Sequence, residues 1–132
     1  MSFSKDIERF NKKVMKRFII VKKRAALGLF TNVIMTTPVL TGALRNNWQF
    51  NMGQPAETII EGFDKSGMSV LSKTAQDMEV IDAYTTFYFT NNLPYIIPIE
   101  YDSYSAQAPN GIVRANIARW DQIVAAAAKG VK

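Results

Sequence analysis

A stripe of apolar residues at helical spacing runs through the first quarter of the chain. Its members are separated by three or four residues: Ile7, Phe10, Val14, Phe18, Val21, Ala25, Leu29 and Val33. This spacing predicts one face of an α-helix over residues 1–36, with Ser4 as its N-cap and Pro38 ending it. Such a helix is roughly 45 Å long, longer than a domain of this size is wide. We therefore expect part of it to project from the domain or to meet a neighbour.

The same segment is strongly basic. The chain has 16 Lys and Arg against 11 Asp and Glu, and residues 1–24 contain nine of these bases and only two of the acids. A basic amphipathic helix can meet nucleic acid, an anionic membrane or the acidic surface of another subunit, and a solvated helix face is an equally weighted alternative. The candidate contact residues are Lys12, Lys13, Lys16, Lys23 and Arg24.

Composition argues against an enzyme. The chain has no Cys and no His, which removes disulfides, thiolate nucleophiles, imidazole bases and the usual zinc, copper and haem ligands. The glycine spacing of Gly62–Gly67 is that of a phosphate loop, but the lysine that such a loop needs is missing. The acids at 77, 79, 82, 100 and 102 come with no accompanying motif. We expect no catalytic residues, no metal and no cofactor.

The stretch that follows the basic segment, Ala25–Leu44, has no charged residue and raises the question of a membrane anchor. Its five Thr and Asn residues and Pro38 lower its hydrophobicity below that of a spanning helix, and a charged lead of 24 residues is long for a signal peptide. We expect a soluble, unprocessed protein without a membrane partner.

The rest of the chain predicts a small sheet between helices. Residues 48–52, 58–63 and 84–90 have the character of strands, and the last has apolar residues on both faces, which is typical of a covered, central strand. A short helix is expected over 70–81, whereas 95–101 has no clear assignment. A closing helix over 109–130 would begin at Pro109 and bury Val113, Ile117, Trp120, Val124 and Ala127.

These elements predict one α+β domain over 1–132. It would have a long basic helix (1–36) and a C-terminal helix (109–130), packed on a small, mostly antiparallel sheet with an inserted helix (41–108).

Two blocks of the sequence resemble a known family. The first is Thr37-Pro38-Val-Leu-Thr-Gly-Ala-Leu-Arg-Asn-Asn-Trp48. The second begins with Asn91-Asn-Leu-Pro-Tyr95 and continues through Ile99-Glu-Tyr101 to Ser105-Ala-Gln-Ala-Pro-Asn-Gly-Ile-Val-Arg114. Together with the order of the elements, they are similar to the neck and tail-completion proteins of long-tailed bacteriophages, small head-to-tail joining proteins. Such proteins often have a glycine after the Glu-Tyr pair, where this chain has Asp102–Tyr104.

The resemblance implies a structural virion protein without catalytic activity. It would be made in the bacterial cytoplasm and assemble as a homo-oligomeric ring, with six as the expected number of subunits, at the head-proximal end of the tail. Its expected partners are copies of itself, the tail terminator, the head connector and, without sequence preference, DNA in the lumen of the ring.

Several residues of the two blocks are candidates for contacts. Arg45 is the lone base between Ala25 and Ala56, which suggests an acidic partner, either Glu100 in the same chain or a carboxylate on the next subunit. The polar, aromatic loop over 101–111 has the composition of an ordered binding loop. The proposed interface residues are Tyr95, Tyr101, Tyr104, Ser105, Gln107 and Pro109. The motif residues expected to act structurally are Pro38, Thr41, Gly42, Leu44, Trp48, Pro94 and Gly111.

Two other functions remain open at this point. The basic helix could bind DNA without sequence specificity, and this binding would weaken steeply as salt rises. It could also lie on a membrane surface, although we expect its phenylalanines to be needed in the core.

Overall fold

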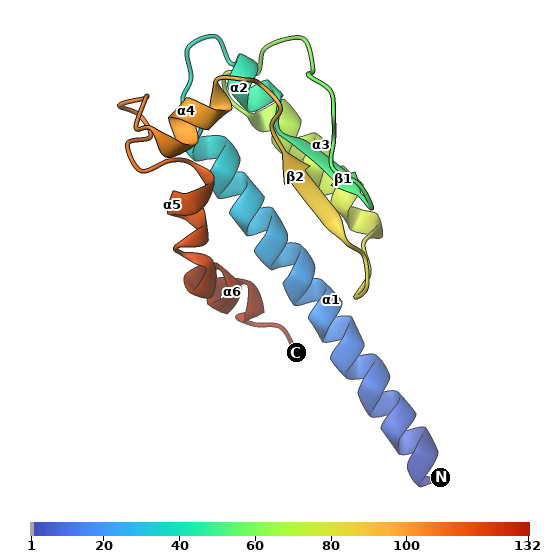
Figure 1. Cartoon of the computed structure of the whole chain (residues 1–132). Coiled ribbons are helices and arrows are strands. Elements are labelled where there is room, and N and C mark those ends of the chain that lie inside the picture. Colours follow the sequence, from blue (N-terminus) through green and yellow to red (C-terminus); the bar gives the residue numbers. More distant parts are fainter. Residues whose placement is uncertain (1) are drawn as a thin grey trace.

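The computed structural model describes residues 2–132, which are arranged around one long helix (Figure 1). The α+β class is confirmed: several helices accompany a single antiparallel pair of strands. In chain order the elements are α1 (Phe3–Thr36), α2 (Ala43–Asn46), β1 (Gln49–Met52), α3 (Met68–Asp77), η1 (Met78–Val80), β2 (Phe87–Thr90), α4 (Ile96–Tyr101), α5 (Val113–Ile117) and α6 (Trp120–Ala128).

Helix α1 has the predicted extent but a different N-cap. The hydroxyl of Ser2, and not that of Ser4, accepts a hydrogen bond from the backbone N–H of Lys5 at 3.3 Å. The helix ends at Thr36, and the extended backbone of Thr37 precedes Pro38 as expected. Its N-terminal part extends past the rest of the chain (Figure 1).

The sheet has two strands instead of the three predicted. Strand β1 pairs with β2 in antiparallel register, with Phe50 opposite Phe89. Residues 58–63 form no strand, because side-chain amides take up their backbone groups. Asn47 both accepts from the N–H of Ile60 at 2.8 Å and donates to its carbonyl at 3.0 Å. Further amides of Asn46, Gln49 and Asn92 donate to the carbonyls of 56, 58 and 61.

Strand β2 is shorter than predicted and is not central. Residues 82–85 form a turn in which the Asp82 carboxylate accepts from the N–H of Tyr84 and the hydroxyl of Thr85. The strand begins only at Phe87, and the Tyr84 side chain is exposed. Aromatic residues on both faces of the segment thus did not mean that both faces are covered.

The core consists of two clusters along the C-terminal part of α1. In the first, Val33 and Ile34 pack with the α2 segment, α3 and the chain around α4 and α5. In the second, Phe30 packs under the sheet and stacks on Phe89 with ring centroids 4.2 Å apart. Trp48 stacks on the same Phe89 ring at 5.1 Å, which joins the clusters. The N-terminal part of α1 contributes to neither.

The predicted C-terminal helix is two helices, and Pro109 precedes both in a loop. Asn116 of α5 is buried and donates to the Thr36 hydroxyl at the end of α1, whereas Ile123 of α6 packs against Gly28. The break at 118–119 lets each helix make its own contact with α1. Ile117 and Trp120, predicted to be buried, are exposed beside this break.

The unassigned segment 95–101 is mostly helical. Helix α4 includes Pro98 in its first turn, where the missing N–H costs no intrahelical hydrogen bond. The predicted helix over 70–81 is α3 followed by the single 3-10 turn η1.

Candidate functional site

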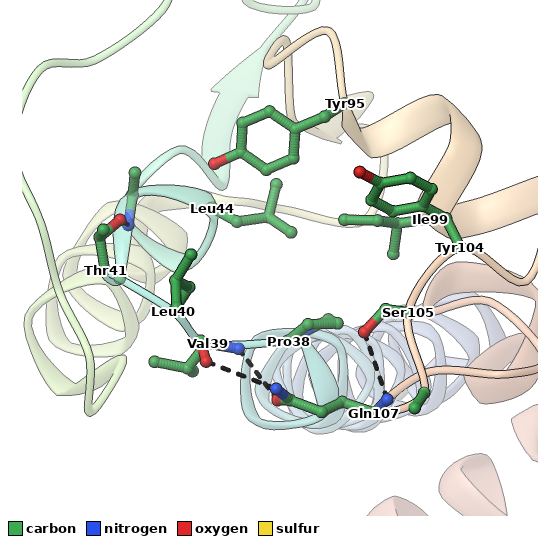
Figure 2. Close-up of a pocket in the computed structure, with 13 residues that line it drawn as sticks. Pro38, Val39, Leu40, Thr41, Leu44, Tyr95, Ile99, Tyr104, Ser105 and Gln107 are labelled. Atoms are coloured by element: carbon green, nitrogen blue, oxygen red, sulfur yellow. Dashed lines mark hydrogen bonds between the residues drawn. The ribbon is translucent and has the colours of Figure 1, made fainter.

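The two sequence blocks that carry the family resemblance lie together and enclose a pocket of about 600 Å³ (Figure 2). The first block contributes the segment 38–44, and the second contributes Tyr95, Ile99 and residues 104–107. Figure 2 shows Tyr95 across the pocket from Val39 and Gln107. Most of the lining side chains are apolar, while hydroxyl and amide groups from both blocks lie among them. A pocket of this character suits an apolar side chain or short segment of a partner.

Gln107 fastens the two blocks to each other. Its Oε1 accepts from the backbone N–H of Val39 at 3.1 Å, and its Nε2 lies 3.5 Å from the Val39 carbonyl (Figure 2). The Ser105 hydroxyl accepts from the N–H of Gln107 and closes a local turn. Gln107 and Ser105 thus shape the pocket, while Tyr95 and Tyr104 supply partly exposed rings at it.

Arg45 does not pair with Glu100, the first of the two partners predicted for it. Its guanidinium donates to three backbone carbonyls: Met35 and Lys65 at 2.8 Å and Thr37 at 3.1 Å. Two of these belong to the last turn and C-cap of α1, where the carbonyls lack intrahelical partners and the helix dipole favours a cation. Arg45 is therefore a structural cap and fixes where the first block begins.

Glu100 is also structural. Its buried carboxylate accepts from the backbone N–H groups of Ile112, Val113 and Arg114, which are the free donors at the start of α5. The Arg114 guanidinium lies 3.5 Å from the same carboxylate and donates to the Glu100 carbonyl. It also lies over the Tyr101 ring at 4.8 Å. Arg45 and Glu100 therefore cap different helix ends: Arg45 the C-terminal end of α1 and Glu100 the start of α5.

Two motif glycines are required by close backbone approach. Gly42 has φ +94°, and a Cβ there would lie 2.6 Å from the Lys65 nitrogen. Gly111 has φ +85°, and a Cβ there would lie 2.6 Å from the Glu100 carbonyl oxygen. Neither position accepts an L side chain without moving backbone. Gly42, which lines the pocket, thus lets its segment approach residues 64–65, and Gly111 lets the chain before α5 approach Glu100.

The other motif residues have the expected structural roles. Leu44 and Trp48 are in the core, and the Trp48 indole donates to the Thr37 hydroxyl at 2.9 Å. Thr41 accepts from the N–H of Ala43, which caps the turn before α2. Pro94 is in the turn that precedes α4 and is exposed. Of the proposed interface residues, Tyr101 and Pro109 lie outside the pocket lining; the Pro109 carbonyl accepts from Ser103.

Ser103, in the loop after α4, has a backbone conformation that favours glycine. It is the single non-glycine residue with positive φ among residues 2–132, at +51°. Glycine adopts this conformation without steric cost, whereas serine does so uncommonly. The loop thus makes a glycine-type turn at Ser103, two residues after Tyr101.

The N-terminal half of α1, residues 3–20, is the second candidate surface, and we call it the projecting half. Its apolar face is exposed. The prediction that its phenylalanines are in the core was therefore wrong. We call the five exposed residues of this face the apolar stripe: Phe3, Ile7, Phe10, Val14 and Phe18. Lys12, Lys13 and Lys16 are exposed on the same half.

The two remaining candidate bases belong to the body of the molecule. Lys23 donates to the Glu79 carbonyl at 2.7 Å, and Arg24 is exposed beside α6. Sequence reasoning missed their neighbour Lys22, whose ammonium donates to the carbonyls of Asp82, Ala83 and Thr85. Lys22 and Lys23 thus hold α1 to residues 79–85, and the projecting half begins on the N-terminal side of these contacts.

The candidate acids serve other purposes. Asp77 pairs with Lys73 at 2.9 Å on α3, Asp82 holds its turn, and Glu100 caps α5. Hydrogen bonds from the Tyr84 N–H and the Thr85 hydroxyl lower the pKa of Asp82 below its usual 3.8. Within residues 2–132, no three carboxylates gather as a metal site would require. The same part of the chain contains no helix long and apolar enough to cross a membrane.

Sequence reasoning also missed Val39, Leu40 and Ile99 as pocket residues. The sequence gives a signal for Leu40 alone, because it is a large apolar residue in a turn bounded by Pro38, without strand or helix periodicity. In the structure Leu40 is 90% exposed.

Comparisons of the chain with protein-family models, curated proteins and solved structures find no match.

Proposed function

We propose that this protein is a structural virion protein that completes the head-proximal end of a bacteriophage tail and helps to join it to the capsid connector. It would act by ring-like self-association and by docking onto adjoining proteins, without catalysis. The observation that carries the proposal is the convergence of the two family-like blocks on one pocket. Segments 38–44 and 95–107 are more than 50 residues apart in the sequence, yet Gln107 and Val39 are hydrogen-bonded across them.

The structural roles of the motif residues support the same proposal. Gly42, Arg45, Glu100 and Gly111 are engaged within the chain, where they hold the two blocks in place. What these residues leave accessible is an apolar turn at Leu40 and the rings of Tyr95 and Tyr104. Aromatic and aliphatic side chains at a pocket rim are typical of a protein interface. The motifs therefore build a contact surface.

The test is the substitution Leu40→Asp in a phage that depends on this gene. Because Leu40 is almost fully exposed, the substitution should leave the fold intact while it places a charge where an apolar partner group would be buried. Electron microscopy of the lysate should then show full heads beside complete, unattached tails, or tails of irregular length.

Val80→Asp is the matched control, since Val80 is also exposed but lies on η1 outside this pocket. It should give normal virions. Normal, infectious virions from Leu40→Asp, or from a phage without the gene, would contradict the proposal.

A second candidate function is nonspecific DNA binding, favoured by one observation. Lys5, Arg9, Lys12 and Lys16 follow one another in steps of four, three and four residues, which places them on one face of the exposed projecting half. Binding through several phosphates would fall steeply as salt rises. Purified protein titrated onto DNA at two salt concentrations distinguishes this function from the assembly role, because contacts through apolar groups are much less sensitive to salt.

A further inference from the structure

The projecting half of α1 has an apolar face that nothing in residues 2–132 covers. Phe3 is 80%, Phe10 66% and Phe18 51% exposed, and Ile7 and Val14 are also exposed. These five residues recur at three or four positions, so they form one continuous stripe over about four turns. Scattered apolar residues are normal at a surface, whereas an aligned stripe with three phenylalanines marks an interaction site.

The stripe continues directly into an interface that is already formed. The steps of three and four lead from Val14 and Phe18 to Val21, Ala25 and Gly28 on the same side of α1. At Gly28 this side is covered by α6, whose Ile123 lies 3.4 Å from the position of a glycine Cβ. Helix α6 ends at Ala128 beside the middle of α1, and α1 extends beyond it toward the N-terminus (Figure 1). The side of α1 that packs on α6 at Gly28 is therefore continuous with the exposed stripe.

The order of side chains along the stripe is the same in both directions. Read from either end it is Phe, branched aliphatic, Phe, branched aliphatic, Phe. An antiparallel second copy centred near Phe10 places Phe3 opposite Phe18 and Ile7 opposite Val14 of the other chain. Phe10 then faces its own copy across the two-fold axis. Such a surface is self-complementary, as an isologous dimer interface must be.

The charges beside the stripe fit the same arrangement. Asp6 and Arg17 lie on one flank, eleven residues or about three turns apart. In the antiparallel pair, Asp6 of one copy comes within about 3 Å along the axis of the level of Arg17 of the other. The Arg17 Nε is shielded from solvent and has no hydrogen-bond partner within residues 2–132. Among the described residues, the Asp6 carboxylate has a 4.0 Å exposed contact with Arg9. The pair would supply two symmetry-related ion pairs.

The basic face does not oppose this contact. Lys5, Arg9, Lys12 and Lys16 repeat the spacing of the stripe two residues later, which turns them by about 200° from it. In an antiparallel pair these bases point away from the partner helix. A lipid surface would also accept an apolar stripe, but it would not account for its two-way order or for the Asp6 and Arg17 flank.

We propose that two copies of this chain associate through their projecting halves as an antiparallel helix pair centred near Phe10. This contact goes beyond the proposed function, because an isologous pair closes at two copies and a ring needs a further, heterologous contact. The pairing leaves the pocket at the other end of α1 open for such a contact. It is tested on purified protein, so its failure and the failure of the virion role are seen in separate experiments.

The first test is sedimentation of the purified chain and its variants. The chain should dimerise, and Phe10→Asp should raise the dimer Kd by at least about a hundredfold, because a charge replaces the central ring. Asp6→Arg or Arg17→Asp alone should raise Kd by about tenfold, and the double substitution should restore it. Lys12→Ala, on the opposite face, is the matched control and should leave Kd unchanged. Circular dichroism confirms that each variant is folded.

The second test measures direction, and the absence of cysteine makes it clean. Phe3→Cys and Phe18→Cys variants, one with a tag that changes its size, should form a mixed disulfide when oxidised together and little of either homodimer. Phe10→Cys should crosslink to itself. Efficient homodimers of Phe3→Cys and of Phe18→Cys would indicate a parallel pair and overturn the proposal. So would a chain that stays monomeric, including one that sediments with phosphatidylglycerol vesicles.

Discussion

The two halves of α1 share one apolar spacing but have opposite surroundings. In the packed half, residues 21–36, Ala25 and Val33 of this spacing are buried, as are Phe30 and Ile34 outside it, under the sheet, α3 and the C-terminal helices. In the projecting half, Phe10 and its neighbours on the stripe are exposed. Periodicity therefore indicates that a helix has an apolar face, while the rest of the chain decides whether that face is in a core or at an interface. Matched substitutions in the two halves measure this difference.

The largest expected effect comes from Ile34→Ala in the packed half. Ile34 is fully buried, and its truncation should lower the free energy of unfolding by about 2–5 kcal/mol through lost burial and a cavity. The same change at exposed Ile7 should alter it by less than about 0.5 kcal/mol. Urea unfolding of both variants, at a protein concentration that keeps copies apart, gives the comparison. Equal losses at the two positions would mean that the projecting half is packed in solution.

A smaller loss is expected when the packed half loses its C-terminal cap. Arg45→Met removes the guanidinium that donates to the carbonyls of Met35, Thr37 and Lys65, which should cost about 2–3 kcal/mol. Arg45→Lys should recover only part of this, because an ammonium cannot reproduce the planar fork. The readout is thermal or urea unfolding. A lysine variant as stable as the native chain would show that charge alone suffices at this helix end.

The boundary between the halves is tested by Lys22→Met. This substitution removes the donor to the carbonyls of Asp82, Ala83 and Thr85, and we expect a loss of about 1 kcal/mol. Hydrogen exchange in residues 82–86 should accelerate, while exchange in the projecting half stays as it was. Lys16→Met, six residues earlier and exposed, is the control. Unchanged exchange in 82–86 would show that the turn is held by its own hydrogen bonds.

The smallest effect is a pH dependence of the same turn. Hydrogen bonds from Tyr84 and Thr85 lower the pKa of Asp82 in the folded chain. Since the folded pKa lies below the unfolded one, the stabilisation is present above about pH 4 and is lost as pH falls through the folded value. Asp82→Asn should remove this dependence. NMR titration of the Tyr84 and Thr85 amides measures it, and a midpoint at or above the ordinary Asp pKa would contradict it.

Much of the helical architecture was predictable from local pattern. The extent of α1 follows from its apolar spacing and Pro38, and the core positions of Leu44 and Trp48 follow from their large apolar side chains in a block with one charge. The absence of a strand over 58–63 was not predictable in the same way. Residues 58–63 have strand-like composition, but the amides of Asn47 and its neighbours occupy the backbone groups that a strand would have used. Strand propensity describes a residue's fit to a sheet, not whether a sheet edge is available.

The candidate site was predictable in its residues and not in its contacts. Tyr95, Tyr104, Ser105 and Gln107 do line the pocket, but of the two partners predicted for Arg45, Glu100 was wrong. Opposite charges are the obvious partners in a sequence. In the folded chain each instead meets a helix end, where several backbone groups lack partners and together satisfy a charge better than one distant side chain.

By itself, the sequence determined that this chain contains a long basic amphipathic helix, helices with a small amount of strand, and no Cys or His chemistry. These properties depend on residue type and on spacing along one element, so they can be read locally. Only the tertiary structure decided that half of the helix is uncovered, that the two family-like blocks meet around a pocket, and that Arg45 and Glu100 act as caps. Those outcomes depend on which distant segments compete for the same apolar faces and unpaired backbone groups, and that competition is resolved only when the whole chain is folded.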